Sequence, residues 1–306
     1  MPKGAALGLE RSCVDPTPDQ LRSGPASPGL ERVEARLAGG GYAPHRHDTY
    51  ALGVTLAGVQ AFRYQGAARH SLPGELFVLH PDELHDGRPG SDAALRYRIL
   101  YVDPGLIRAA LGGRQALPFV RAAVSRDRRL RHAIAAGLDD LDQPLEDLAH
   151  DAVVQGLADA LAAADPSTAP RHVSQRHDRA VARARDRLDA AGTGDVGSAE
   201  LEALTGLTRY ALARQFRACL GTTPHRYLVL RRLDRARALI RSGAPLVEAA
   251  LASGFADQSH LTRHFKRAYG VPPGRWAALT ARGWPPRHED TKRPCPWEGP
   301  ARLQER

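Results

Sequence analysis

Short apolar runs alternate with turn residues between positions 31 and 103. YALGVTLAG at 50–58 and LRYRILYV at 95–102 have the length and the β-branched or aromatic content of strands, and Gly, Pro and Asp bound them. Similar runs occur at 31–39, 61–66 and 68–81. Several strands at short spacing, with no helix between them, predict a small β-barrel or β-sandwich.

The apolar positions change to helical spacing after residue 103. Helices are expected within 104–113, 126–141 and 144–164. Pro144 suits the first turn of the last helix, whose apolar stripe consists of Leu145, Leu148, Ala152, Leu157, Ala160, Leu161 and Ala164. This stripe either covers the barrel or also pairs two subunits, and the pattern alone leaves both alternatives open.

One pattern then occurs twice. LARQFRACLGTTPHRY at 212–227 and LTRHFKRAYGVPPGRW at 261–276 keep the same register at an offset of 49 residues. In each copy a short helix, a glycine turn at Gly206 or Gly254 and a second helix are expected in that order, which is the helix-turn-helix arrangement. Ser198 is expected to cap the first short helix, and Thr208 and Asp257 to cap the two second helices.

The second helix of each copy has an inward apolar face and an outward polar face. The inward residues are Leu212 and Phe216 in the first copy and Leu261 and Phe265 in the second. The outward residues are Tyr210, Ala213, Arg214 and Arg217 in the first copy and Ser259, Thr262, Arg263 and Lys266 in the second. A long helix between the copies, expected at 224–243, would span roughly 28 Å at 1.5 Å per residue. Such a spacer could place the two outward faces in neighbouring major-groove segments, which recur about every 34 Å.

Charge is distributed unevenly along the chain. Residues 1–170 contain 18 Lys and Arg against 21 Asp and Glu, whereas residues 171–306 contain 25 against 13. A basic half beside an acidic half predicts a polyanion as the partner of the basic half. An Arg-rich helix face is usually only solvated. The prediction of a polyanion partner therefore depends on the repeated pattern and the excess of basic residues together.

Composition narrows the class of protein further. The mean hydropathy of −0.39 and the lack of an apolar run near 18 residues argue against a membrane span, and no membrane is expected among the partners. The first 20 residues lack the apolar core of a signal peptide, so a cytoplasmic protein is expected. The three cysteines are odd in number and far apart, which indicates neither a disulfide framework nor a thiolate zinc site. Cys219, inside the first copy, is expected to be a buried thiol.

Residues 175–280 resemble the DNA-binding domain of the AraC/XylS family, above all in A-x-x-x-G-F-x-D-Q-S-H-L-T-R-x-F-K-R-x-x-G-V-x-P at 250–273. The resemblance implies seven helices with two helix-turn-helix units and a transcription regulator. By position, the residues facing the bases would be Arg209, Tyr210, Ala213 and Arg214 in the first unit and Gln258, Ser259, Thr262 and Arg263 in the second. Arg217 and Lys266 are better placed for phosphate. Ser253 departs from the family pattern, and a local change of packing is expected there.

PHRHDTYALGV at 44–54 and LPGELFVLHPDELHDG at 72–87 resemble the two cupin motifs of AraC-type ligand-binding domains. Metal-binding cupins use two histidines and a glutamate from the first motif and a histidine from the second. Here the histidines would be His45, His47 and His85, and the glutamate is missing. We therefore assign the three histidines to effector binding and expect no cofactor, although three imidazoles could still hold a metal ion. His80 is expected to be an ordinary residue at the end of a strand.

These features predict an α+β, multidomain regulator with a cupin-like barrel, flanking helices and an all-α DNA-binding domain. The expected parts are an arm at 1–30, the barrel at 31–103, a helical flank at 104–164, a linker at 165–174, the DNA-binding domain at 175–282 and a disordered tail at 283–306. The expected partners are double-stranded DNA, a small-molecule effector and a second copy of the chain, and RNA polymerase is a further candidate. Activation and repression stay open. The alternative is a metal-dependent cupin enzyme fused to a DNA-binding module, which the incomplete motif and the lack of another acid–base constellation disfavour.

Overall fold

The computed structural model of the chain describes residues 19–113, 116–166 and 175–281. We refer to residues 19–166 as the N-terminal half and to residues 175–281 as the C-terminal half. The predicted disordered tail, most of the predicted linker and residues 1–18 of the predicted arm lie outside the described residues.

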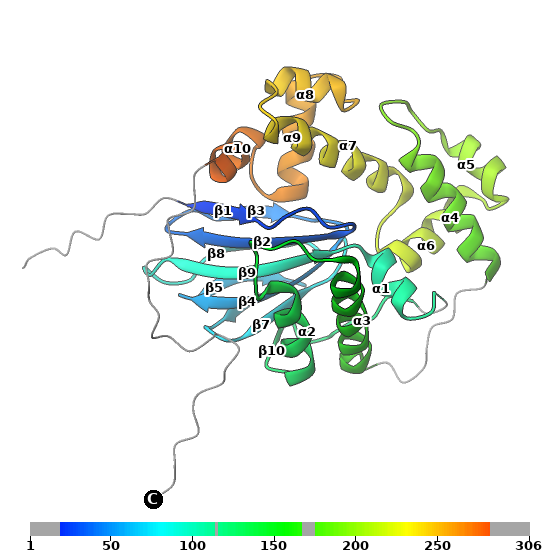
Figure 1. Cartoon of the computed structure of the whole chain (residues 1–306). Helices are drawn as coiled ribbons and strands as arrows, with labels where there is room; N and C mark the ends of the chain where they lie inside the picture. Colours follow the sequence, from blue (N-terminus) through cyan, green and yellow to red (C-terminus); the bar gives the residue numbers. More distant parts are fainter. Residues whose placement is uncertain (1–18, 114–115, 167–174, 282–306) are drawn as a thin grey trace, which may run out of the picture.

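The strands of the N-terminal half form two antiparallel sheets (Figure 1). The six-stranded sheet has the order β1 (Gln20–Ser23), β2 (Leu30–Leu37), β9 (Leu95–Val102), β4 (Tyr50–Ala57), β7 (Leu76–Leu79) and β10 (Val124–Ser125). The four-stranded sheet has the order β3 (Tyr42–His45), β8 (His85–Pro89), β5 (Gln60–Tyr64) and β6 (Ala67–Ser71). The prediction of a cupin-like β fold is confirmed.

Alternation along β4 shows how the sequence builds two apolar layers. Tyr50, Leu52 and Val54 face a core shared with the flanking helices, whereas Ala51 faces the core between the two sheets. Successive side chains of a strand point to opposite faces, so one strand serves both layers.

Four strands were not predicted: β1, β3, β8 and β10. The prediction of an arm at 1–30, outside the barrel, was wrong for residues 20–23, because β1 pairs with β2 from Gln20↔Arg36 to Ser23↔Val33. The strands β3 and β8 contain Pro, Gly, His and Asp in place of an apolar run, and these residue types are typical of turns.

Three helices cover the outer face of the six-stranded sheet: α1 (Pro104–Ala110), α2 (Arg128–Leu138) and α3 (Asp147–Ala164) (Figure 1). The prediction that α3 begins at Pro144 was wrong, since Glu146 is its N-cap. Its predicted stripe is also divided. Leu157 and Leu161 are buried, but Leu148 is 85% exposed, so the first turns of α3 do not cover the sheet.

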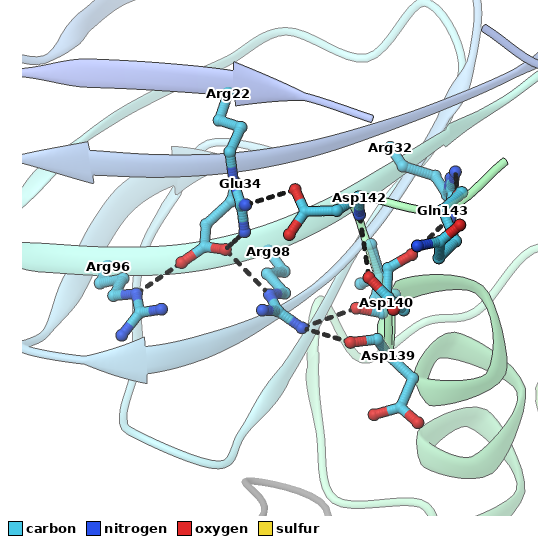
Figure 2. Close-up of polar contacts among 10 residues, drawn as sticks. Arg22, Arg32, Glu34, Arg96, Arg98, Asp139, Asp140, Asp142 and Gln143 are labelled. Atoms are coloured by element: carbon cyan, nitrogen blue, oxygen red, sulfur yellow. Dashed lines mark hydrogen bonds and ion pairs between the residues drawn. The ribbon is translucent and has the colours of Figure 1, made fainter. Parts of the chain in front are cut away.

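A buried carboxylate ties the flank to the sheet. Glu34 on β2 is fully buried and accepts hydrogen bonds from Arg22 (2.9 Å), Arg96 (2.5 Å) and Arg98 (3.1 Å) (Figure 2). Burial raises the pKa of Glu34, but Arg98 and Arg96 and the hydrogen bonds of Arg22 and Arg96 outweigh burial and lower it. Arg98 also donates to the Leu138 carbonyl, which joins β9 to the end of α2.

The C-terminal half consists of the seven helices that the AraC resemblance implied, all within residues 175–281. They are α4 (Gln175–Asp189), α5 (Ser198–Thr205), α6 (Arg209–Leu220), α7 (Pro224–Arg241), α8 (Leu246–Ala252), α9 (Gln258–Tyr269) and α10 (Pro273–Ala281). The N-cap of α5 is Gly197 rather than the predicted Ser198. We call α5–α6 the first unit and α8–α9 the second unit.

The long helix α7 belongs to the cores of both units. Its first turns place Tyr227 and Leu228 in the core of the first unit, and its later turns place Leu233 and Ile240 in the core of the second. Its 18 residues span about 27 Å, close to the predicted length. The second unit lies over the edge of the sheets, where α9 contacts β3 and α10 contacts β1, while α6 of the first unit contacts α1 (Figure 1).

Candidate DNA-binding surface and effector cavity

The second helix of each unit begins and ends in the same way. Thr208 caps α6 and Asp257 caps α9, each by accepting a backbone N–H in the first turn. Gly221 and Gly270 end the two helices at φ +69° and +71°, a left-handed conformation that favours glycine. The two helices therefore match at both ends, as the repeat predicts.

The proposed DNA-contacting side chains lie on the outer surface of these helices, as their spacing predicts. Phe216 and Phe265 on the inner faces are fully buried. Seven proposed contact residues are exposed, namely Arg209, Tyr210, Arg214, Arg217, Gln258, Ser259 and Arg263. Lys266 is also exposed, and Ala213 and Thr262 are half-buried at equivalent positions. No structural element of the described residues covers either face.

The C-terminal glycine of each helix contacts the N-terminal half. A Cβ atom at Gly221 would lie 2.4 Å from Cβ of Pro81, and one at Gly270 would lie 2.8 Å from the Ala43 oxygen. The Ala43 amide also donates to the Gly270 carbonyl at 3.0 Å. Neither docking contact was predicted, because no residue pattern in the repeat distinguishes a glycine that only caps a helix from one that also packs.

Ion pairs between the two halves surround the second unit and α7. Arg231 pairs with Asp48 at 2.9 Å, and Arg237 pairs with Glu31 at 2.6 Å. Arg237 also lies over the Trp276 ring, 5.2 Å from its centroid, so this guanidinium has both a carboxylate and an aromatic partner. The side chains of Arg231 and Arg237 are 33% and 16% exposed.

A cavity of about 330 Å³ lies between the two halves. His45, His47 and His85 line it from the N-terminal half, so the structure brings the three predicted effector residues together. The C-terminal half contributes further lining residues that were not predicted, namely Tyr227, Leu230, Arg231, Asp234, Arg237, Tyr269 and Trp276. One sequence feature could have indicated the α7 part of this lining, namely a polar helix face with Arg231, Asp234 and Arg237 at i, i+3 and i+6.

The three histidines are held in one orientation by the backbone. Nδ1 of His45 lies 2.8 Å from the Ala43 oxygen, Nδ1 of His47 lies 2.9 Å from the Thr49 oxygen, and Nδ1 of His85 lies 2.9 Å from the Glu83 oxygen. A carbonyl oxygen carries no proton, so each Nδ1 must be the donor. The ring of His85 lies 4.3 Å from that of His45 and 4.7 Å from that of His47, centroid to centroid.

The cavity keeps these imidazoles uncharged. Burial, together with the nearby His85, lowers the pKa of His45 to about 3. Burial, together with His85 and His45, holds the pKa of His47 well below its ordinary value. Burial also lowers the pKa of His85. A neutral imidazole with its proton on Nδ1 has a lone pair on Nε2.

His80 belongs to a different group. It follows β7, and both ring nitrogens are satisfied by the hydroxyl of Tyr64 at 2.7 Å and the amide of Val120 at 2.9 Å. This histidine is a core residue at a strand end, as predicted. Cys219 is buried, also as predicted, and burial raises the pKa of its thiol to about 11.

Comparison with known proteins adds two family matches. Residues 27–158 match the AraC-like ligand binding domain, and residues 201–278 match a helix-turn-helix domain.

Across residues 19–113, 116–166 and 175–281, every helix is too short or too polar to cross a membrane.

Individual transcriptional regulators are similar to this chain over different shares of its length. The HTH-type transcriptional regulator YbfI of Bacillus subtilis is 27% identical over 71% of this chain and 80% of its own length. The transcriptional activator RhaS of Escherichia fergusonii is 39% identical over 24% of this chain and 28% of its own length.

A solved structure of ToxT from Vibrio cholerae is similar in fold, with a TM-score of 0.61 and 12% identity, over 83% of this chain and all of that one. Another ToxT structure, with a bound unsaturated fatty acid, gives the same TM-score over 84% of this chain and 97% of that one. The two family matches follow the order of the two halves, and the fold agrees over both. The chain belongs to the AraC family of transcriptional regulators, with an N-terminal AraC-like ligand-binding domain and a C-terminal helix-turn-helix domain.

Proposed function

We propose that this regulator contacts two successive major-groove segments of one DNA duplex through α6 and α9. The observation that carries the proposal is the pair of matched, exposed helix faces joined by the single long helix α7. Arg214 and Arg263 occupy equivalent positions and can each donate two hydrogen bonds to one guanine. Gln258 can bind an adenine in the same bidentate way.

Binding-site selection with the purified protein, followed by footprinting, tests this proposal. Protection is expected over two major-groove segments on one face of the duplex. Arg214→Ala and Arg263→Ala should each cost about 1–3 kcal/mol on the selected site and relax specificity at one base pair. Arg235→Ala, an arginine of α7 outside both faces, is the matched control. Protection of one segment only, or equal losses for all three variants, would contradict the proposal.

We further propose that a small-molecule effector occupies the cavity between the two halves. The cavity offers apolar and aromatic walls with a few polar groups, as ligand sites generally do. Because α7 and α9 form part of its wall, an occupant contacts the C-terminal half directly. An effector there can change how the second unit is held.

The charges of the cavity favour a neutral or cationic effector. Five carboxylates line it, those of Glu31, Asp48, Asp86, Asp103 and Asp234, against the two guanidiniums of Arg231 and Arg237. Both arginines already have carboxylate partners. A carboxylic acid such as the fatty acid bound by ToxT would have to displace one of these partners. Thermal-shift screening of matched acid, amide and amine compounds tests this charge preference, and a consistent advantage of the acids would contradict it.

Other parts of the function stay predictions. Pairing of two copies through the exposed first turns of α3 is testable by comparing the oligomeric state of the protein with that of Leu148→Glu. Contact with RNA polymerase and a cytoplasmic location follow from the role of a transcription regulator. Neither activation nor repression is favoured by these residues.

A further inference from the structure

We propose that His45, His47 and His85 bind one divalent first-row transition-metal ion through their Nε2 atoms. The three residues come from two strands and the loop that follows β3. His45 ends β3, His85 begins β8 directly opposite it in the sheet, and His47 lies two residues beyond β3. One ring nitrogen of each histidine lies within 4.8 Å of those of the other two.

The tautomers make these rings ready ligands. Each Nδ1 donates its proton to a backbone carbonyl, so each Nε2 has only a lone pair. Among residues 19–113, 116–166 and 175–281, no group hydrogen-bonds to these Nε2 atoms. All three rings line the cavity, so a cation inside it can reach their Nε2 lone pairs. Metal-bound histidines typically hold their other ring nitrogen in this way.

The surroundings favour a cation. The three side chains are at most 8% exposed, and the cavity lining carries three more negative than positive groups. Zn²⁺ binds imidazole nitrogen at about 2.0–2.1 Å, which in a tetrahedral site places ligand nitrogens roughly 3.4 Å apart. Ring nitrogens that lie within 4.8 Å of one another would therefore have to approach by at most about 1.4 Å.

The chemistry of the set defines the class of ion. Imidazole suits Zn²⁺, Cu²⁺, Fe²⁺ and Ni²⁺, whereas Mg²⁺ and Ca²⁺ prefer oxygen ligands. Asp48 is the nearest carboxylate in sequence, but its Oδ2 lies 2.9 Å from Arg231. Asp48 is therefore committed to the ion pair between the halves. Three protein ligands leave the ion with a position for water or for a donor group of an effector.

The site lies next to the second unit. Ala43 and Arg46, which flank His45, donate backbone hydrogen bonds to the carbonyls of Gly270 and Arg267 at the end of α9. A shift of His45 on ligation would reach α9 through these two hydrogen bonds. This position distinguishes the site from a surface histidine cluster that binds metal without consequence for the fold.

The test uses the full-length chain without an affinity tag, stripped with a chelator and titrated with Zn²⁺ in a calorimeter. One equivalent should bind. His47→Gln and His85→Gln should each lower the affinity by at least the roughly 10–100-fold that loss of an outer hydrogen-bond partner costs. His70→Gln, an exposed histidine on β6, should bind like the parent. Absence of stoichiometric binding, or equal binding by all variants, would overturn the proposal.

A second measurement on the unaltered chain covers the case in which a variant fails to fold. Long-range ¹⁵N correlation spectra report each imidazole nitrogen, and Zn²⁺ should shift the Nε2 signals of three histidines while their Nδ1 atoms stay protonated. Unshifted imidazole signals at saturating Zn²⁺ would overturn the proposal. DNA binding by the stripped protein is measured separately, so failure of the metal site and failure of the DNA-binding proposal give different results.

Discussion

The first and second units end their recognition helices with equivalent glycines, but different surfaces receive them. Gly221 faces Pro81 and Leu117, and a partly buried ion pair between Arg108 and Asp178 supports the first unit nearby. Gly270 faces the backbone of β3 and the ring of His45. The second unit also shares its apolar core with the N-terminal half, through Leu21 and Tyr42.

This difference separates two kinds of constraint. The DNA-facing positions of α6 and α9 agree because both helices are proposed to enter the same kind of groove. The docking surfaces have no such reason to agree. Within residues 19–113, 116–166 and 175–281, only the second unit is joined to the cavity wall by both an apolar core and backbone hydrogen bonds. We therefore expect an occupant of the cavity to act mainly on α9.

Substituting the two glycines should give the largest effect and break the symmetry between the units. Gly270→Ala adds left-handed strain of about 1 kcal/mol or more and forces its Cβ against strand backbone, at a further cost of about 1–3 kcal/mol. Gly221→Ala adds similar strain but meets the ring of Pro81, which lies in a loop and can shift. Urea unfolding measures the loss of stability in each variant. Hydrogen exchange at the Ala43 and Arg46 amides reports whether the contact with α9 has loosened.

Gly206→Ala is the matched control for this pair. Gly206 has φ +67°, but no atom lies within 4 Å of the position that a Cβ would take there, so its substitution adds strain without a clash. Gly270→Ala should therefore destabilise the protein more than Gly206→Ala does. Equal losses for Gly206→Ala, Gly221→Ala and Gly270→Ala would show that docking at the glycines contributes nothing.

The ion pairs between the two halves should also stabilise different parts of the C-terminal half: Glu31–Arg237 should hold α7 and α10, and Arg108–Asp178 should hold α4. Glu31→Gln removes the carboxylate that faces Arg237 and Arg241, and leaves a largely buried guanidinium less well compensated. We expect the free energy of unfolding to fall by about 1–3 kcal/mol. Breaking a fully buried pair costs about 3–5 kcal/mol, and the smaller loss is expected here because the Glu31 side chain is 31% exposed. Asp178→Asn should loosen α4 instead. Hydrogen exchange should increase in α7 and α10 for the first variant and in α4 for the second, and a reversed pattern would contradict the assignment.

Much of this arrangement could be predicted from the sequence. The inward and outward faces of α6 and α9, their caps and the length of α7 follow from spacing and capping residues, because these are local properties. The strands β3 and β8 could not be predicted, since their Pro, Gly, His and Asp residues are typical of turns and only pairing with each other makes them strands.

The candidate site was predictable only in part. The histidines stood out through the cupin motifs, but the wall formed by Tyr227, Arg231 and Trp276 depends on how the two halves pack. That packing leaves no periodic signal in either half. The contribution of Leu148 was mistaken for the same reason, because a helical stripe predicts a buried face without showing where its partner surface ends.

Lowering the pH should protonate Glu31 and so weaken its ion pair with Arg237, which helps to hold the second unit against the N-terminal half. Burial raises the pKa of this carboxyl, but Arg237 and Arg241 outweigh burial and lower it below 4.5. A depressed carboxyl pKa contributes stability that is present well above pH 4.5 and is lost as the pH falls through the native value. Exchange at α7 and α10 should therefore rise on acidification in the parent, and Glu31→Gln should remove this increment. An identical acid response in the variant would assign it to other carboxyls, such as Glu34.

The smallest expected effect tests whether the units are equivalent towards DNA despite their different docking. Arg217 and Lys266 occupy matching exposed positions on α6 and α9, further along each helix than the proposed base contacts. If each neutralises one phosphate, its replacement by alanine should weaken binding to all sequences alike and reduce the slope of log K against log salt by about 0.9. Gel-shift titrations at several salt concentrations measure that slope. Equal reductions would mean that both units approach the backbone in the same way, whereas a reduction for Lys266→Ala alone would mean that only the more firmly docked unit is held against the duplex.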